Sequence, residues 1–347
     1  MLTKNRHCRW LWMAGWLLLL AAVTTGSAQE VKKVGTSAAS FLRISAGARG
    51  TAMGSAFVAI ANDASAMYWN PAGLAQLTRY ALLADYAPWL SALNYNFFAL
   101  ALPMGDLGTV GVQITALTTE KMLVTTVEQP MGTGASFDAA SVAVGVTYAR
   151  ALTDKFAIGG TFKFIQERIF NSKATGIAFD IGTLYTTPFA GVRLGVNIAN
   201  FGTDLRIDGE DLNIRVDVAP EQEGNNQSVV GRLKTDDFSS PLIMKVGLAW
   251  DPIKTNSNRL TLALDAANPN DNAQSVNIGA ELALMDNLLV LRGGLNELFL
   301  ENRERQFAAG LGVNLKMENG MTISASFAYQ SFEHLSALNR FSLELTF

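Results

Sequence analysis

Apolar and polar residues alternate along most of the chain after residue 77. Val142, Val144, Val146 and Tyr148, for example, fall on one face of an extended segment, with small or polar residues between them. A period of two residues is typical of a β-strand that separates two different environments. The pattern predicts about fourteen strands, an even number as in bacterial outer-membrane barrels. They span residues 78–87, 93–102, 107–117, 137–150, 155–168, 174–187, 190–201, 240–250, 258–267, 273–285, 287–297, 305–317, 320–330 and 339–347.

The end of the chain shows this alternation clearly. Phe341, Leu343, Leu345 and Phe347 share one face of the last strand, and polar residues lie between them. In a soluble protein, an edge strand of this kind would place the free carboxylate beside a buried ring, whereas the closing strand of a barrel turns its apolar face to lipid. The ending also resembles the signal by which the barrel-assembly machinery recognises its clients. We therefore predict a barrel-closing strand with Phe347 as its terminal lipid-facing aromatic.

The connections between the predicted strands support a closed barrel. Those after even-numbered strands are short, such as 103–106 and 151–154, whereas 118–136 and 202–239 are long connections after odd-numbered strands. An outer-membrane barrel has short periplasmic turns at one end and longer extracellular loops at the other. The sequence therefore predicts an all-β fold, a transmembrane antiparallel β-barrel over residues 78–347 in contact with outer-membrane lipid.

Residues 1–28 have the pattern of a secretory signal peptide. Basic residues precede an apolar stretch at 10–23, and small residues at 26–28 predict cleavage before Gln29. The apolar stretch is shorter than the ~20 residues of a membrane-spanning helix. Cys8 is the only cysteine and lies before this stretch, so the mature chain would hold no disulfide, thiol nucleophile or thiolate metal site.

Composition agrees with a membrane barrel and argues against a nucleic-acid partner. Hydrophobic residues make up 49% of the chain and charged residues only 16%, below the ~25% typical of soluble domains. After the signal peptide no apolar run approaches a spanning helix, so the apolar residues are spread over alternating strands. The formal net charge is −3, and it becomes −6 without the three basic residues of the signal peptide. This charge lacks the basic footprint of a nucleic-acid-binding protein.

Residues 29–77 differ from the rest of the chain. Small residues and glycines dominate, and no strand alternation is sustained. Residues 64–67 suggest a short helical turn, and Asn70 followed by Pro71 indicates a turn or a helix start. A segment of this composition packs closely against another part of the protein. We therefore predict that residues 29–77 form an N-terminal hatch inside the barrel lumen.

The sequence offers no convincing catalytic constellation. The mature chain has one histidine, His334, in a predicted surface loop, and a triad or metal site needs more partners than this. The glycines at 105–108 indicate a turn, because no phosphate-binding lysine and no helix follow them. We therefore expect a protein that is not an enzyme and has no cofactor, catalytic residue or metal site.

The connection at 202–239 is strongly acidic. It is interpreted as an exposed docking surface or a calcium site, although acidic runs are more often simply solvated, and its acidic residues lack the spacing of an EF-hand loop. Apolar alternation over 212–218 predicts a local hairpin.

Charged residues also occur on the strand faces opposite the lipid-facing residues. Both signs are present, and charges in a low-dielectric interior are expected to pair. A structural ion network that holds the hatch is the main expectation, and a charged transport path is the alternative. The predicted lumen charges are Lys163, Asp180, Arg193, Lys245, Asp265, Glu281, Arg292, Lys316 and Glu344.

Six aromatic residues cluster near the first predicted hairpin. We interpret them as an interfacial girdle, and a hydrophobic ligand entrance or a partner surface is the alternative. They are Tyr80, Tyr86, Trp89, Tyr95, Phe97 and Phe98.

Several stretches of the N-terminal segment resemble the PorV/PorQ family of outer-membrane proteins, which belongs to the wider FadL-like barrel superfamily. They lie at 41–44, 47–50, 53–59, 62–66 and 68–75. The Asn-Pro-Ala-Gly-Leu run within the last stretch is shared across the superfamily, so it indicates the fold better than the function. The resemblance implies a fourteen-stranded barrel whose N-terminal segment enters the lumen as a hatch. The candidate hatch-motif residues are Arg43, Arg49, Asn62, Asp63, Asn70, Pro71 and Gly73.

This resemblance also implies a function. PorV-like proteins act in type IX secretion, where they accept secreted proteins from the translocon, recognise the cargo's C-terminal signal domain and deliver it to a surface attachment complex. The implied partners are therefore the translocon, cargo C-terminal domains and attachment-complex proteins. The alternative is a FadL-like transporter of hydrophobic small molecules, which needs a continuous apolar pocket near the hatch. A third reading is a barrel that mainly supports a partner.

Overall fold

The main feature of the structure is a closed ring of strands. This computed structural model describes residues 34–90, 93–222, 224 and 228–347. Fourteen antiparallel strands of this described part form the barrel, which closes where β1 (Ala81–Pro88) pairs with β19 (Leu338–Thr346). At this seam Ala81 lies opposite Thr346. The prediction of a barrel of about fourteen strands is confirmed.

Each predicted strand overlaps one strand of the structure, and sequential neighbours pair around the ring. Between β1 and β19 lie β2 (Leu93–Pro103), β3 (Thr109–Thr119), β6 (Ala139–Thr153), β7 (Phe156–Ile169), β8 (Ser172–Thr186), β9 (Arg193–Gly202), β13 (Ile243–Lys254), β14 (Arg259–Pro269), β15 (Ser275–Leu284), β16 (Leu289–Leu298), β17 (Arg305–Lys316) and β18 (Thr322–Phe332).

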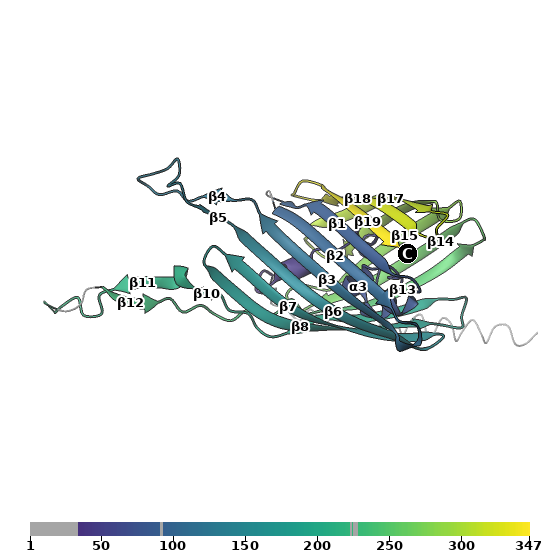
Figure 1. The fold of residues 1–347 in the computed structure, drawn as a ribbon, viewed down its shortest axis with the longest axis horizontal. Helices are drawn as coiled ribbons and strands as arrows, with labels where there is room; N and C mark the ends of the chain where they lie inside the picture. Colours follow the sequence, from purple (N-terminus) through teal and green to yellow (C-terminus); the bar gives the residue numbers. More distant parts are fainter. Residues whose placement is uncertain (1–33, 91–92, 223, 225–227) are drawn as a thin grey trace, which may run out of the picture. The chain divides into compact units, whose positions relative to one another are not determined.

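The two long connections carry small elements of their own, and both lie at the same end of the barrel (Figure 1). The first holds the two-stranded pair β4 (Met122–Leu123) and β5 (Ser136–Phe137). The second holds a hairpin of β11 (Asn213–Val216) and β12 (Val229–Arg232), which confirms the hairpin predicted there. The same connection contains β10 (Asp208–Gly209), which pairs with β8, and η5 (Glu210–Leu212).

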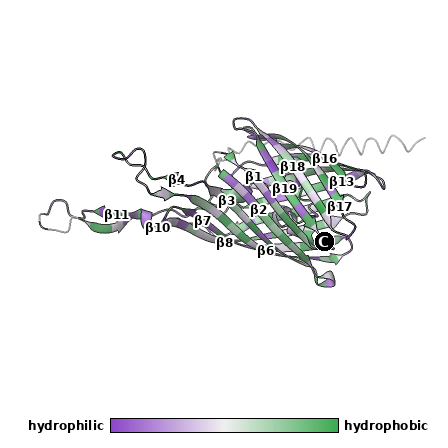
Figure 2. Ribbon diagram, turned by 45° about the horizontal axis from the view of Figure 1, so that its top comes forward, coloured by the Kyte–Doolittle hydropathy of each residue, from purple (hydrophilic) through white to green (hydrophobic). Residues whose placement is uncertain are grey.

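Alternation along the strands separates an outer apolar face from an inner face (Figure 2). On β6, Val144 and Val146 are 41% and 51% exposed, whereas Ala143 between the outward residues is buried. On β19, Phe341 and Leu343 point outward and Ser342 is buried. Apolar side chains that point outward along whole strands are suited to contact with lipid. The outward orientation of Phe341 and Leu343 on the last strand therefore agrees with the predicted barrel.

The terminal aromatic takes part in closing the ring. The backbone N–H of Phe347 donates to the Tyr80 carbonyl oxygen at 3.0 Å, and the Tyr80 N–H donates to the Phe347 carbonyl oxygen at 3.0 Å. The two rings lie 5.8 Å apart between centroids, and the Phe347 side chain is exposed on the outer face.

The N-terminal segment packs against the inner face of the barrel and contains four short helices, η1 (Ser40–Arg43), α2 (Ala48–Ala52), α3 (Ala66–Trp69) and η2 (Pro71–Gln76). Helix α2 contacts β16 to β19, whereas η2 contacts β3 and β6 to β8. The segment therefore touches two separate parts of the wall, and Figure 1 shows it in purple between the strands. We call residues 34–77 the hatch; the predicted start at residue 29 and the signal peptide at 1–28 lie outside the described residues.

The helices of the described residues are short, and none has the length and apolarity required to cross a membrane.

Glycines permit the hatch backbone to lie directly against the wall. A Cβ atom at Gly294 of β16 would lie 2.3 Å from the backbone nitrogen of Gly54. Inside the hatch, a Cβ atom at Gly73 would lie 1.9 Å from the Ala61 carbonyl oxygen. Backbone atoms cannot move away from such a clash as a flexible side chain can, so only glycine fits these positions.

The interpretation of six aromatic residues as one girdle is wrong in part. Tyr86 and Phe98 are exposed on the outer face, as a girdle requires. Tyr95 and Phe97 are buried instead; the Tyr95 hydroxyl donates to the Ile44 carbonyl oxygen of the hatch at 3.2 Å. Adjacent residues of a strand point to opposite faces, so Phe97 and Phe98 cannot share one.

Candidate functional site

Arg49 is the main ionic contact between the hatch and the barrel. Its Nε and Nη2 atoms donate to the two carboxylate oxygens of Glu281 on β15, at 2.8 and 3.1 Å. Its Nη1 atom donates to Asn62 at 2.6 Å and to Asp63 at 2.9 Å, both within the hatch. Burial by itself lowers the pKa of Arg49, but the carboxylates of Glu281 and Asp63 outweigh it and raise the pKa above its ordinary value. The guanidinium therefore stays charged and fixes α2 to the wall.

Glu281 connects the hatch to two further strands. It accepts hydrogen bonds from Arg292 Nε on β16 and from Arg259 Nη2 on β14, each at 2.9 Å. Its side chain is only 2% exposed, so the three arginines compensate a carboxylate that is removed from water. A polar cavity of about 380 Å³ borders this cluster at the short-turn end of the barrel, and Arg79 and Glu344 also line it.

Two other predicted lumen carboxylates bind the hatch backbone. Asp265 Oδ2 accepts the N–H groups of Phe57 and Val58 at 2.7 and 2.9 Å. Glu344 Oε1 accepts the N–H of Ala64 at 3.0 Å. Such bonds satisfy hatch donors that regular secondary structure leaves unpaired. Together with the Arg49–Glu281 cluster, these contacts hold the hatch against the wall.

Asn70 and Pro71 explain the geometry of the Asn-Pro-Ala-Gly run. Asn70 caps η2 by accepting the Ala72 N–H at 3.2 Å. Its amide nitrogen donates to the carbonyl oxygens of Val58 at 2.9 Å and of Thr183 on β8 at 3.0 Å. Pro71 begins η2, where a missing N–H costs nothing. The side chain therefore joins two parts of the hatch to the wall.

The sequence reasoning missed the buried pair of Asp85 and Arg340. These residues lie on β1 and β19, their side chains are 0% and 1% exposed, and they form an ion pair across the closing seam. Asp85 also accepts the Ser342 hydroxyl at 2.7 Å and the hatch N–H of Gly47 at 3.1 Å. The signal was available, because both residues share the inward face of strands that a closed barrel must pair.

Three more predicted lumen charges, Lys163, Asp180 and Arg193, also form ion pairs. Lys163 Nζ lies 2.5 Å from Asp180 on the neighbouring strand. Arg193 Nη2 lies 2.6 Å from Asp251 of β13.

The prediction for Lys316 is wrong. Its side chain is 61% exposed and its Nζ lies 2.8 Å from Asp286 in the adjacent turn. Lys316 has the inward parity and still pairs with Thr322 of β18, but it is the last residue of β17 and its side chain is exposed beside the turn.

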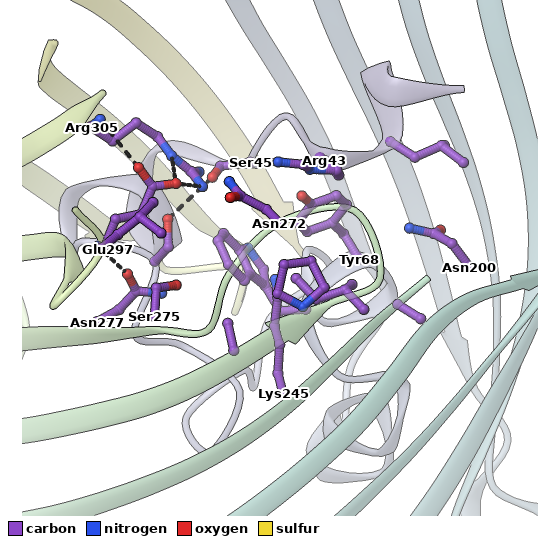
Figure 3. A pocket seen from close by; sticks show the side chains of 18 of the residues that line it. Arg43, Ser45, Tyr68, Asn200, Lys245, Asn272, Ser275, Asn277, Glu297 and Arg305 are labelled. Atoms are coloured by element: carbon purple, nitrogen blue, oxygen red, sulfur yellow. Dashed lines mark hydrogen bonds and ion pairs between the residues drawn. The ribbon is translucent and has the colours of Figure 1, made fainter. Parts of the chain in front are cut away.

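A second polar pocket lies beside the hatch at the long-loop end of the barrel (Figure 3). Its enclosed volume is about 50 Å³, and Tyr68, Trp69 and Lys245 are among its lining residues. Arg43 of the hatch lines it too and forms an ion pair at 2.6 Å with Asp271. Burial raises the pKa of Tyr68 to about 12, so its phenol stays neutral.

The remaining candidate residues lie in exposed connections. His334 is exposed, and its Nδ1 lies 3.0 Å from Glu304 Oε1. Among the described residues, no cluster of three or more histidine, cysteine or acidic side chains is placed to hold a metal ion. In the acidic connection, Asp208 pairs with Arg232 at 3.0 Å, as a solvated loop would.

The comparisons with known proteins agree with this architecture. A crystal structure of the toluene transporter TodX from Pseudomonas putida is 12% identical, with a TM-score of 0.55 over 87% of this chain and 97% of that chain. A structure of the monoaromatic hydrocarbon channel CymD is 12% identical, with a TM-score of 0.54 over 86% of this chain and 96% of that chain. These likenesses concern the fold alone. No curated protein matches the chain.

A protein-family model provides the more specific match. The model described as "Type IX secretion system protein PorV" matches residues 27–268, which include the hatch and the strands from β1 to β14. The family and the fold are those of secretion or transport barrels in the outer membrane. With its hatch joined to the wall through Arg49 and Glu281, the chain belongs to the PorV family of type IX secretion outer-membrane barrels.

Proposed function

We propose that this barrel binds protein partners of type IX secretion through the hairpins at its long-loop end. The partners would be the translocon and the C-terminal signal domains of cargo, which the barrel would pass to a surface attachment complex. Membership of the PorV family supports the pathway. The contacts that fix the hatch across the lumen support docking over passage through the barrel.

The observation that carries this proposal is the exposure of apolar side chains on the long connections. In the second connection, Val218, Val230 and Leu233 are 70%, 66% and 51% exposed. In the first, Val127 and Met131 are 95% and 92% exposed. Extracellular loops face water, not lipid, and apolar side chains exposed there are available to contact a partner. The β11–β12 hairpin is also a sheet of only two strands, so its edges can accept a strand of a partner.

The net charge of the second long connection favours one class of partner. Residues 202–239 contain nine acidic and four basic residues, a formal net charge of −5. A negative field of this kind steers a basic surface and suppresses acidic ones. We infer that the partner presents a basic, β-rich face.

The alternative is uptake of hydrophobic small molecules, since TodX is a toluene transporter and CymD a monoaromatic hydrocarbon channel. The two cavities beside the hatch are lined by many polar and charged side chains, among them Arg49, Glu281 and Lys245. An apolar hollow of about 790 Å³, larger than either of these cavities, lies on the outer face of the strands beside Trp250 and Leu262. The polar lining of the interior cavities therefore favours docking of a protein partner over uptake of a hydrophobic molecule.

The test replaces residues 210–231 by a short Gly-Ser linker. The cut leaves the Leu205–Phe238 bridge and the buried Leu205 in place, so the barrel should still fold. Loop closure depends only weakly on loop length. A second, separate deletion removes residues 124–134 of the first long connection, which carry Val127 and Met131 of the same proposed surface. Native complexes are then captured from membranes, and uptake of a hydrophobic fluorescent probe is measured in parallel.

We expect the first deletion to reduce capture of translocon or cargo at least severalfold, with probe uptake unchanged. The second deletion reports whether both connections share the binding surface. Full partner capture combined with altered uptake would overturn the proposal, because the connection would then gate a small-molecule channel.

A further inference from the structure

The first residues of the hatch lie at the long-loop end of the barrel. The Ala38 N–H donates at 3.0 Å to the carbonyl oxygen of Ser239, the last residue of the second long connection. The Ala39 N–H donates at 3.0 Å to Glu167 Oε2, which comes from the long-loop end of β7. The chain is therefore fixed to two separate elements where the hatch begins.

The connection between β14 and β15 provides a third contact at the same end. Asp271 Oδ2 accepts the Ser37 hydroxyl at 2.5 Å and also pairs with Arg43, as described above. The Asp271 side chain is only 3% exposed, so this contact is part of the packed structure. Three elements of the long-loop end thus surround residues 37–43.

The last residues of the hatch lead to the opposite end of the barrel. Arg79, two residues after the hatch, donates to the Gly320 carbonyl oxygen in the short turn between β17 and β18. The next residue, Tyr80, exchanges two backbone hydrogen bonds with Phe347 at the seam. The hatch therefore runs through the lumen from the long-loop end to the short-turn end. Because the long loops of such barrels are extracellular, its first residues face the outside of the cell.

Residues 34–40, which we call the rim segment, bring the hatch to the surface at the long-loop end. Val34 is 61% exposed and Ser40 is exposed as well, whereas Ala39 and Phe41 are buried. The chain therefore passes from the surface into the packed hatch within a few residues.

The rim segment adjoins the base of the second long connection, because Ala38 and Ser239 are hydrogen-bonded side by side. The segment carries no charged residue. It therefore does not oppose the negative field of residues 202–239, which favours a basic partner. A partner that binds at the base of this connection meets the rim segment too.

We propose that the rim segment is displayed on the cell surface and forms, with the base of the second long connection, one docking surface for a protein partner with a basic, β-rich face. The surface location rests on the contacts of the hatch alone, whereas the kind of partner rests on the proposed function. The hatch is then part of the docking surface as well as the plug of the lumen.

Cysteine labelling of intact cells tests the location. The predicted mature chain has no cysteine, because Cys8 lies in the predicted signal peptide. S40C places a thiol on the rim segment, and S257C makes the same change at an exposed site in the short turn between β13 and β14. K234C marks the exposed second connection. We expect a membrane-impermeant maleimide to label S40C and K234C on intact cells, and S257C only after the outer membrane is disrupted.

Labelling of S40C that requires disruption of the membrane, as for S257C, would overturn the location. Labelling of S257C on intact cells would overturn it as well, because the short-turn end would then face outward. V34C provides a second exposed position on the rim segment and decides the matter where S40C does not assemble.

Photo-crosslinking separates this inference from the proposed function. S40C, V34C and K234C are each coupled to a benzophenone maleimide and irradiated in native membranes. We expect the rim segment and the second connection to crosslink the same partner. Crosslinks from K234C with none from S40C or V34C would overturn the inference and leave the proposed function standing. If K234C also gives no crosslink, the proposed function fails and the docking part of this inference fails with it.

Discussion

Replacement of Asp85 by leucine should weaken the barrel seam and the hatch together. Asp85 lies on the first strand and accepts hydrogen bonds from Arg340 and Ser342 of the last strand and from the Gly47 N–H of the hatch. The carboxylate is fully buried, and the Arg340 side chain is 1% exposed. D85L leaves that guanidinium without its anion in a site that water does not reach.

The expected loss follows from the burial of this pair. Removal of one partner from a buried ion pair costs ~3–5 kcal/mol, because the other charge stays desolvated and unpaired. Replacement of both partners by apolar residues is often close to neutral. The double variant D85L/R340M should therefore be more stable than D85L by more than the ~0.5 kcal/mol scatter of additive effects.

Urea titration of the refolded protein in lipid vesicles, followed by tryptophan fluorescence, measures these free energies of unfolding. The control is K316M, which removes an exposed ion pair with Asp286 and should cost ~0–1 kcal/mol. A loss below 1 kcal/mol for D85L would refute the reasoning. So would strictly additive effects of D85L and R340M, because the two side chains would then not act as a pair.

Further predictions concern the outer face, the hatch and the two ends of the chain. V144K places an ammonium on the lipid face and should cost ~2–4 kcal/mol in vesicle titrations if it lies near the midplane; full tolerance would place Val144 away from lipid. G73A should loosen the hatch in limited proteolysis, because its new Cβ would lie 1.9 Å from a backbone oxygen, whereas G160A meets its nearest atom at 3.5 Å and should be mild; equal digestion of both would contradict this. Deletion of Phe347 removes two backbone hydrogen bonds to Tyr80, the residue before β1, and should reduce the yield of heat-modifiable barrel in the outer membrane; an unchanged yield would argue against it. The mature protein should begin at Gln29, which N-terminal sequencing of membrane-extracted protein decides; a sequence that still includes residues 1–28 would disprove it.

The sequence by itself determined the barrel, because strand alternation is a local property. Each residue of a strand points to the face opposite its neighbours, so Val144 and Val146 on one side imply an outer wall without any knowledge of partners. Strand number and the two classes of connection follow from the same pattern. The small residues of the hatch also indicated close packing, which the clash distances at Gly73 and Gly294 explain.

Only the tertiary structure decided which charges meet. Asp85 and Arg340 are 255 positions apart in the sequence, and they become neighbours because the ring closes in one register. The register of the neighbouring strands β14, β15 and β16, together with the path of the hatch, gathers Arg49, Arg259 and Arg292 around a single glutamate, which inward parity alone does not specify. Parity likewise placed Lys316 inside, although at the last residue of β17 its side chain is exposed beside the turn. Pairing depends on register, strand ends and the path of the hatch, and these are set by packing over the whole barrel.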